Sequence, residues 1–447
     1  MPVLFGGTLA LLGVIAISRY DPTSLIFRGN DAIDFFGWFW RYRLAAGATF
    51  VDVLLAAVVA AAAIECVRRG WRSSHLDAVP AMLALLVGVS AAITAGWAGP
   101  QDSLHDVLFQ CRNYLYFMAI YFAASRISWT EGRLRRATVW IVLLSLAAAV
   151  LSLWETSTVP TASQVSKAGR SLGVRDIADV PFLLFSQFWL LMLIAERGVR
   201  FWWQKVPVFG ALAYGLYQVF TGVGKTLLVV YPAVLAYIVW SYRLHLRRVF
   251  WTAGAVIAAI LFAGFAIAVW TTGEVRIRSP LYVYTTFNME DLSVATRIGQ
   301  AENFALNLYE RGAVLQGIGI GRKWYTYVPV PEDRAAYPAA EWQSRWHLGA
   351  HVPLLRLGLD FGLGGLAVIG ILILLVFREG RRFLVSASVT PAARAFIQAA
   401  LLVLAFQVVI NSLIGPKTNL LAGFLLGAIS GAIDAVKRGT IQHARRH

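Results

Sequence analysis

Charged residues are scarce in this chain. Asp, Glu, Lys and Arg together make up 14% of its 447 residues, whereas a soluble protein of this length carries about a quarter. Hydrophobic residues make up 58%, and long apolar runs recur from one end of the sequence to the other. This composition is not that of a soluble globular protein, and it predicts an all-α polytopic membrane protein.

Cysteine is also rare, because Cys66 and Cys111 are the whole complement. Both lie inside apolar runs, near opposite faces of the predicted membrane region. A disulfide is therefore not expected, and each thiol should behave as a small hydrophobe. The first apolar run lacks a charged leader and a clear cleavage site, so we expect a retained first helix and not a signal peptide.

Twelve segments are candidate membrane spans, and they make residues 1–447 a single membrane domain. Some are shorter than the roughly 20 residues that cross a bilayer core unassisted, and the first, sixth and eighth, with 16 residues each, are the shortest. The twelve ranges are about 3–18, 48–67, 77–96, 106–125, 137–155, 180–195, 206–222, 226–241, 249–270, 352–377, 396–413 and 418–435.

Acidic residues are outnumbered, and the formal net charge is +16. Arg and Lys gather in alternate connectors, for example at 68–72, 243–248 and 378–382. The positive-inside rule predicts that these connectors and both termini are cytoplasmic. The charge is then a topology signal, and nucleic acid is not needed to explain it.

One outward connector is much longer than the others. Residues 271–351, between the ninth and tenth spans, contain eight Lys or Arg and eight Asp or Glu. Within this loop, residues 291–312 have helical periodicity and end at a glycine. We therefore expect an ordered, partly helical extracytoplasmic loop. The apolar residues predicted to form one buried stripe are Val294, Ile298, Ala301, Ala305 and Leu308.

Several familiar motifs are missing. Gly224-Lys225-Thr226 resembles the end of an ATP-binding loop, but Val219 stands where that motif needs its first glycine. Lys225 instead lies at the predicted outer mouth of two helices. There, a helix start favours anions, although a lysine that snorkels to the interface is the alternative.

Metal and nucleotide motifs are missing too. The sequence has no Asp-x-Asp motif and no His or Cys cluster with metal-ligand spacing, so neither a metal nor a cofactor is expected. The "GIGIG" stretch at 317–321 lacks dinucleotide-binding spacing, and its glycines are expected to shape a turn. Arg322 and Lys323 after it are expected to be rim charges. Arg112, inside the fourth span, should face a cavity or a partner.

Three stretches taken together resemble one family. They are "TGVGKTLL" around Lys225, Arg297 followed by "GIGIG", and "HVPLLRLGLDFGLGGL" from His351 onward. In their order and outward placement they are similar to the O-antigen ligase and O-antigen polymerase superfamily, over roughly residues 160–435. Three positions depart from the family pattern: Lys225 replaces Arg, Val352 replaces Asn, and Asp360 replaces Glu.

The resemblance implies a glycosyltransferase in the bacterial cytoplasmic (inner) membrane, with its active site on the outer face. The donor would be a polyprenyl-pyrophosphate-linked glycan. As a polymerase, the protein would join carrier-linked repeat units and could work with a chain-length regulator. As a ligase, it would transfer the glycan to lipid A–core. A polysaccharide transporter or flippase is the alternative from another class, and it predicts deep intramembrane charges.

The resemblance also implies roles for individual residues. His351 would be the base, or would position the acceptor hydroxyl. Arg297 and Lys225 would bind the pyrophosphate and stabilise the charge that grows on the leaving group. Arg170 or Arg175, in the outer connector before the sixth span, would complete this group of cations.

A second tier of candidates lies close to these residues in the sequence. Arg356 and Asp360 follow His351, and Arg112 comes from the fourth span. His347 and His105 are the competing outward histidines. Cations would take the role that Mg²⁺ has in enzymes that use nucleotide sugars, so the predicted chemistry is metal-independent.

Overall fold

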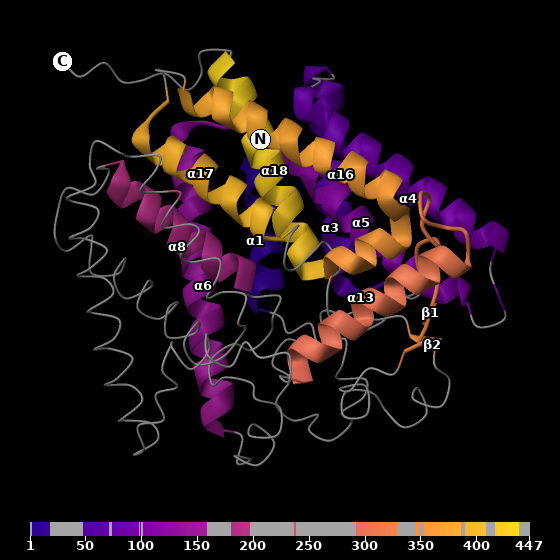
Figure 1. The fold of residues 1–447 in the computed structure, drawn as a ribbon. Coiled ribbons are helices and arrows are strands. Elements are labelled where there is room, and N and C mark those ends of the chain that lie inside the picture. Colours follow the sequence, from indigo (N-terminus) through magenta and orange to yellow (C-terminus); the bar gives the residue numbers. More distant parts are fainter. Residues whose placement is uncertain are drawn as a thin grey trace, which may run out of the picture.

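The structure is a computed structural model, and it describes residues 2–17, 48–70, 74–97, 99, 102–158, 180–196, 237, 292–328, 346–347, 353–385, 389–407 and 416–437. This part of the chain is mostly helical (Figure 1). Its longer helices are α1 (Pro2–Ile17), α3 (Phe50–Arg69), α4 (Ala78–Trp97), α5 (Leu104–Ser125), α6 (Glu131–Thr158), α8 (Val180–Ala195), α13 (Leu292–Glu310), α16 (Pro353–Val385), α17 (Pro391–Phe406) and α18 (Pro416–Lys437). A 3-10 turn, η4 (His75–Asp77), precedes α4, and strands β1 (Trp324–Tyr325) and β2 (Trp346–His347) pair in an antiparallel manner.

The helices match much of the predicted span pattern. Four of them, α3, α4, α16 and α18, are long and apolar enough to cross a membrane. Shorter apolar helices lie in α1, α8 and α17. These features indicate a membrane protein. The predicted spans at 206–222 and 249–270 lie outside the described residues, as does 226–241 apart from residue 237, so the count of twelve stays a prediction.

Local sequence signals set several helix ends. Thr49 and Asp52 form a capping box at the start of α3, in which each side chain hydrogen bonds to the other residue's backbone amide. Ser103 caps α5, and Thr390 caps α17 just before Pro391. Polar residues at the predicted span boundaries thus satisfy backbone amides that would otherwise lack partners.

Helix α5 lies at the centre of the bundle, and α18 packs along it (Figure 1). Small residues permit this close approach, since Gly423 and Gly427 of α18 lie against the carbonyls of Phe117 and Tyr121. The cysteines of α3 and α5 are both free thiols, as the sequence predicts.

Contacts at opposite ends of α5 show that α3 runs parallel to α5 and that α4 runs antiparallel to it. Near the start of α5, Arg112 pairs with Asp52 at the start of α3. Just after its end, Arg126 pairs with Asp77 just before α4. The helix ends predicted to share a side therefore do lie together. Which side faces the cytoplasm stays a prediction.

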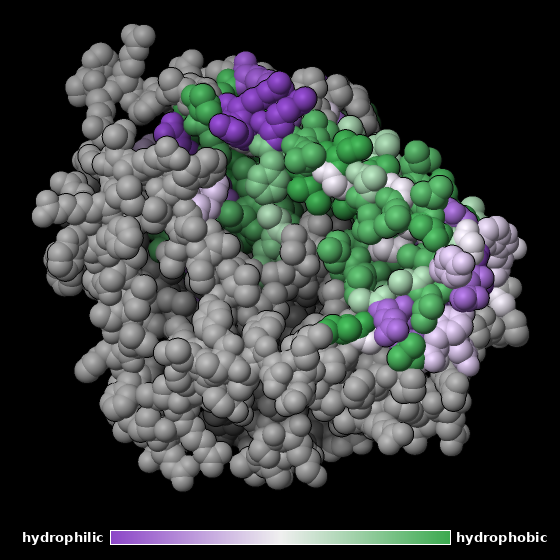
Figure 2. Space-filling model, viewed as in Figure 1, coloured by the Kyte–Doolittle hydropathy of each residue, from purple (hydrophilic) through white to green (hydrophobic). Residues whose placement is uncertain are grey.

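An apolar surface covers α16 and α4 on the face shown in Figure 2. It includes exposed leucines and isoleucines that a soluble protein would bury, such as Leu85, Ile371 and Leu374. Arg378 and Arg382 are exposed near the end of α16. An apolar belt bordered by arginine is typical of a surface that faces lipid.

Candidate functional site

Helix α16 is broken near its start, and the loop that follows α13 fills the break. Gly362 has φ 66° and ψ −173°, a conformation that interrupts the helix. The amides of the two residues after it donate to the carbonyls of Val314 and Leu315 at 2.9 and 3.0 Å. In return, the Ile318 amide donates to the Leu359 carbonyl at 2.7 Å. The loop backbone thereby satisfies polar groups that the break would otherwise leave unpaired.

The "GIGIG" stretch is a turn, as predicted, and each of its glycines meets a different helix. Gly317 lies against the α16 backbone at the break, Gly319 against Thr94 of α4, and Gly321 against Val107 of α5. All three have positive φ, which is 100° at Gly319. Since a Cβ at any of the three would overlap its neighbour, only glycine fits this three-way junction.

Two hydroxyls of α4 fix the loop at this junction. Ser90 donates to the Asp360 carbonyl at 2.6 Å and accepts from the Ile320 amide at 2.8 Å. Thr94 donates to the Ile320 carbonyl at 2.8 Å. Ser90 is seven residues before the end of α4, so the loop descends roughly 10 Å below that end. Non-helical backbone at this depth requires such complete protein contacts.

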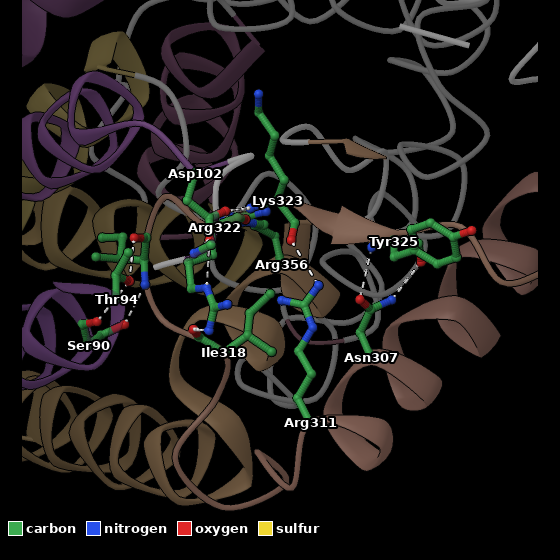
Figure 3. Close-up of polar contacts among 12 residues, drawn as sticks. Ser90, Thr94, Asp102, Asn307, Arg311, Ile318, Arg322, Lys323, Tyr325 and Arg356 are labelled. Carbon is green, nitrogen blue, oxygen red and sulfur yellow. Dashed lines mark hydrogen bonds and ion pairs between the residues drawn. The ribbon is translucent and has the colours of Figure 1, made fainter. Parts of the chain in front are cut away.

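Arg322 follows the turn and is buried, so its predicted place on the rim is wrong. Its Nε lies 3.1 Å from the carboxylate of Asp102, and the two side chains are 9% and 1% exposed. The same carboxylate accepts from the Lys323 amide at 3.1 Å (Figure 3). Asp102, in the short connector between α4 and α5, thus holds the end of the loop at Arg322 and Lys323. No periodic pattern in the sequence indicates this contact.

Two second-tier candidates engage each other. Arg356 and Asp360, one turn apart in α16, form an ion pair at 2.8 Å with both side chains almost fully buried. Arg356 also donates to the Arg322 carbonyl at 3.1 Å. This pair joins the first turns of α16 to the loop, and its geometry fits a structural role.

Two further cations border the loop end. Arg311 donates to the Lys323 carbonyl at 3.3 Å. Burial lowers the pKa of the Arg311 guanidinium, and nearby Arg322 lowers it further. Lys323 extends away from the other labelled residues in Figure 3, is 32% exposed, and has its Nζ 4.0 Å from the Asp106 carboxylate. An anionic ligand can therefore reach Lys323, and this exposure agrees with the rim position that the sequence predicts for it.

Arg112 has the partner that its place within a predicted span requires. It pairs with the carboxylate of Asp52 and donates to the hydroxyls of Tyr116, at 2.7 Å, and Thr49, at 2.9 Å. Tyr116 also donates to Asp52. The guanidinium is thus engaged by several groups, which fits a clamp between α3 and α5 better than a pyrophosphate ligand.

Helix α13 is present, and Leu308 of its predicted apolar stripe packs against the core, but two other members of the stripe are exposed. Ile298 is 47% exposed and Ala305 is also exposed. The buried face carries Asn303, Asn307 and Phe304 instead. The polar members bind backbone, which a periodicity argument built on apolar residues cannot detect.

The principal predicted residues fall in different parts of the chain. Arg297 is in the second turn of α13. His351, Lys225, Arg170 and Arg175 lie outside the described residues.

The competing histidines are both within the described part. His347 belongs to β2, where it pairs with Trp324. His105 is exposed next to Asp106, 3.7 Å from its carboxylate.

No protein-family model matches the chain, and no curated protein sequence matches it. The resemblance to the O-antigen superfamily therefore rests on the three motifs. Within the described residues, no group of three or more His, Cys, Asp or Glu side chains could hold a metal ion.

Proposed function

We propose that this protein is a membrane glycosyltransferase that polymerises polyprenyl-pyrophosphate-linked repeat units at the outer face of the bacterial inner membrane. One contact supports the proposal more than any other. Gly317 of the "GIGIG" motif packs on the backbone of Asp360 and Gly362 in the third motif, over 40 residues later. The second and third motifs, which are separated in the sequence, are therefore adjacent in space.

Packing also supports the proposal. Phe304 of α13 stacks edge-on against Trp324, with ring centroids 4.9 Å apart. Both belong to a small apolar core with Leu359 of α16. The helix that carries Arg297 and the first turns of α16 thus form one unit, and this unit is docked on α4 and α5.

The proposed chemistry follows from the donor. Attack at the anomeric carbon expels a polyprenyl pyrophosphate, so cations must stabilise the growing negative charge. Arg297 and Lys225 would serve this purpose, with Arg170 or Arg175. We add Lys323, because its amine is accessible next to the docked loop. His351 would accept the proton of the acceptor hydroxyl, since its ordinary pKa lies near neutrality.

The decisive experiment uses purified protein in lipid nanodiscs and carrier-linked repeat units. A ladder of products supports polymerisation. A single transfer to added lipid A–core would establish the ligase alternative. A protein that forms no product but moves the lipid-linked glycan across vesicles would be a flippase, and the proposal would then fail.

The topology has its own test. Single cysteines introduced at Lys437 and at Glu302, in a background without Cys66 and Cys111, can be labelled with a membrane-impermeant maleimide. We expect labelling of intact spheroplasts at position 302 and not at position 437. The reverse pattern would invert the predicted orientation.

A further inference from the structure

Two asparagines on α13 hold the segment 324–328, which begins with β1, by its backbone. Asn307 accepts from the Tyr325 amide at 2.8 Å and donates to the Tyr325 carbonyl at 2.7 Å. Asn303 accepts from the amides of Tyr327 and Val328 at 2.7 and 2.9 Å and donates to the Val328 carbonyl at 2.8 Å. Trp324 and Tyr325, the first two residues of this segment, form β1 and pair with β2.

These amides have little hydrogen-bonding capacity left. Asn303 also donates to the Gly299 carbonyl at 2.7 Å, so it makes the four hydrogen bonds that an asparagine side chain can make. Asn307 uses its second hydrogen on the Asn303 carbonyl at 2.7 Å. Both side chains are fully buried. Because hydrogen bonds are directional and apolar contacts are not, these bonds fix the register and tilt of α13.

The tilt matters because Arg297 lies far from the end where α13 meets the docked loop. From Gly312 to Arg297 is 15 residues, or roughly 22 Å along the helix axis. A tilt of about 10° around Gly312 would move Arg297 by roughly 4 Å, and a misplacement of about 1 Å can cost 10²-fold in rate.

We infer that Asn303 and Asn307 are positioning residues, which act through Arg297 by fixing α13 to the segment 324–328. This inference rests on the proposed function. Since Arg297 would stabilise charge that develops in the transition state, loss of its position should lower kcat more than it raises KM.

The test is a double-mutant cycle with the purified protein and carrier-linked donor. Asn307→Ala should lower kcat by 10- to 100-fold with a KM change below about threefold. In an Arg297→Ala background, the same substitution should have little further effect on kcat, because the group it positions is gone. A role confined to general stability would lower activity in both backgrounds, and that additive result would overturn the inference.

Conservative and control variants sharpen the result. Asn303→Asp keeps the acceptor for two backbone amides, but its second carboxylate oxygen would face the carbonyls of Gly299 and Val328 without a hydrogen to donate. It should therefore lose at least as much activity as Asn303→Ala. Glu302→Ala changes an exposed neighbour on the same helix and should leave kcat unchanged. Equal losses in Glu302→Ala and Asn303→Ala would contradict a specific clamp.

A measurement without turnover separates the two proposals. In hydrogen–deuterium exchange, a peptide that covers residues 324–328 should exchange at least tenfold faster in Asn307→Ala than in the wild type. If the wild type transfers no glycan but this acceleration occurs, the proposed function fails and the clamp stands as structure only. Unchanged exchange in an active protein would sink the clamp itself.

Discussion

Arg322 lies 3.1 Å from the carboxylate of Asp102, 220 residues earlier in the chain, and both side chains are buried. A buried pair of this kind is costly to break from one side, because the remaining charge is left without compensation. Asp102 also accepts from the Lys323 amide, so a single carboxylate holds both residues that follow the "GIGIG" turn.

The first prediction concerns this carboxylate. Asp102→Ala should reduce the free energy of unfolding by about 3–5 kcal/mol, seen as a lower melting temperature in detergent. Asp106→Asn is the matched control, because the Asp106 carboxylate makes a long contact of 4.0 Å with Lys323 and is partly exposed. This substitution should cost less than about 1 kcal/mol. Similar shifts of the melting temperature in the two variants would show that the buried pair stabilises the fold no more than the exposed one.

The second prediction concerns the glycine that meets α4. Gly319→Ala forces a side chain onto positive φ, which costs about 1–3 kcal/mol, and places a Cβ onto the Thr94 hydroxyl. We expect a clear loss of folded yield in size-exclusion chromatography. Gly370→Ala in α16 has open space around it and should be neutral or stabilising by up to about 1 kcal/mol. A Gly319→Ala protein as stable as the wild type would rule out the tight junction.

The third prediction separates a structural arginine from a catalytic one. Arg112 is engaged by Asp52, Tyr116 and Thr49. Tyr116→Phe should cost about 1 kcal/mol of stability through the lost hydrogen bonds, and Arg112→Ala should lower the melting temperature further. Transfer activity per folded molecule should remain within a few fold in both. If Arg112→Ala lowered transfer activity 100-fold without loss of stability, Arg112 would instead be a ligand of the pyrophosphate.

The fourth prediction concerns the proposed base. His351→Ala should reduce transfer by at least about 10²-fold, while His347→Ala should not, because β2 uses the backbone of His347. A neutral imidazole is needed, so the wild-type rate should fall as the pH drops below about 6.5. The measurement is a pH profile of ladder formation, and a profile with no acid limb would exclude His351 as the base.

Much of the helical framework could be predicted from hydropathy alone. The apolar run at 48–67 corresponds to α3 (Phe50–Arg69), and that at 418–435 corresponds to α18 (Pro416–Lys437). A span is recognisable because the hydrocarbon core requires about 20 consecutive apolar side chains, and because the backbone within it must pair with itself in a helix.

Hydropathy could not predict most contacts of the candidate site. The turn at 317–321 could be predicted from its glycines, but the helices that they meet could not. Asn303 and Asp102 were missed because their partners are backbone groups, or side chains more than 200 residues away. Polar residues that bind backbone leave no periodic pattern, so only the folded chain brings them into view.

The three-helix junction of the "GIGIG" turn has a consequence for biosynthesis. Ser90 and Thr94 enter the membrane with α4, whereas their partner Ile320 is translated more than 220 residues later. At about 5–20 residues per second, this delay is on the order of 10–45 s. During that interval the hydroxyls of Ser90 and Thr94 lack their partners in the loop, so this part of α4 reaches its final hydrogen bonding only after residue 320 has been made.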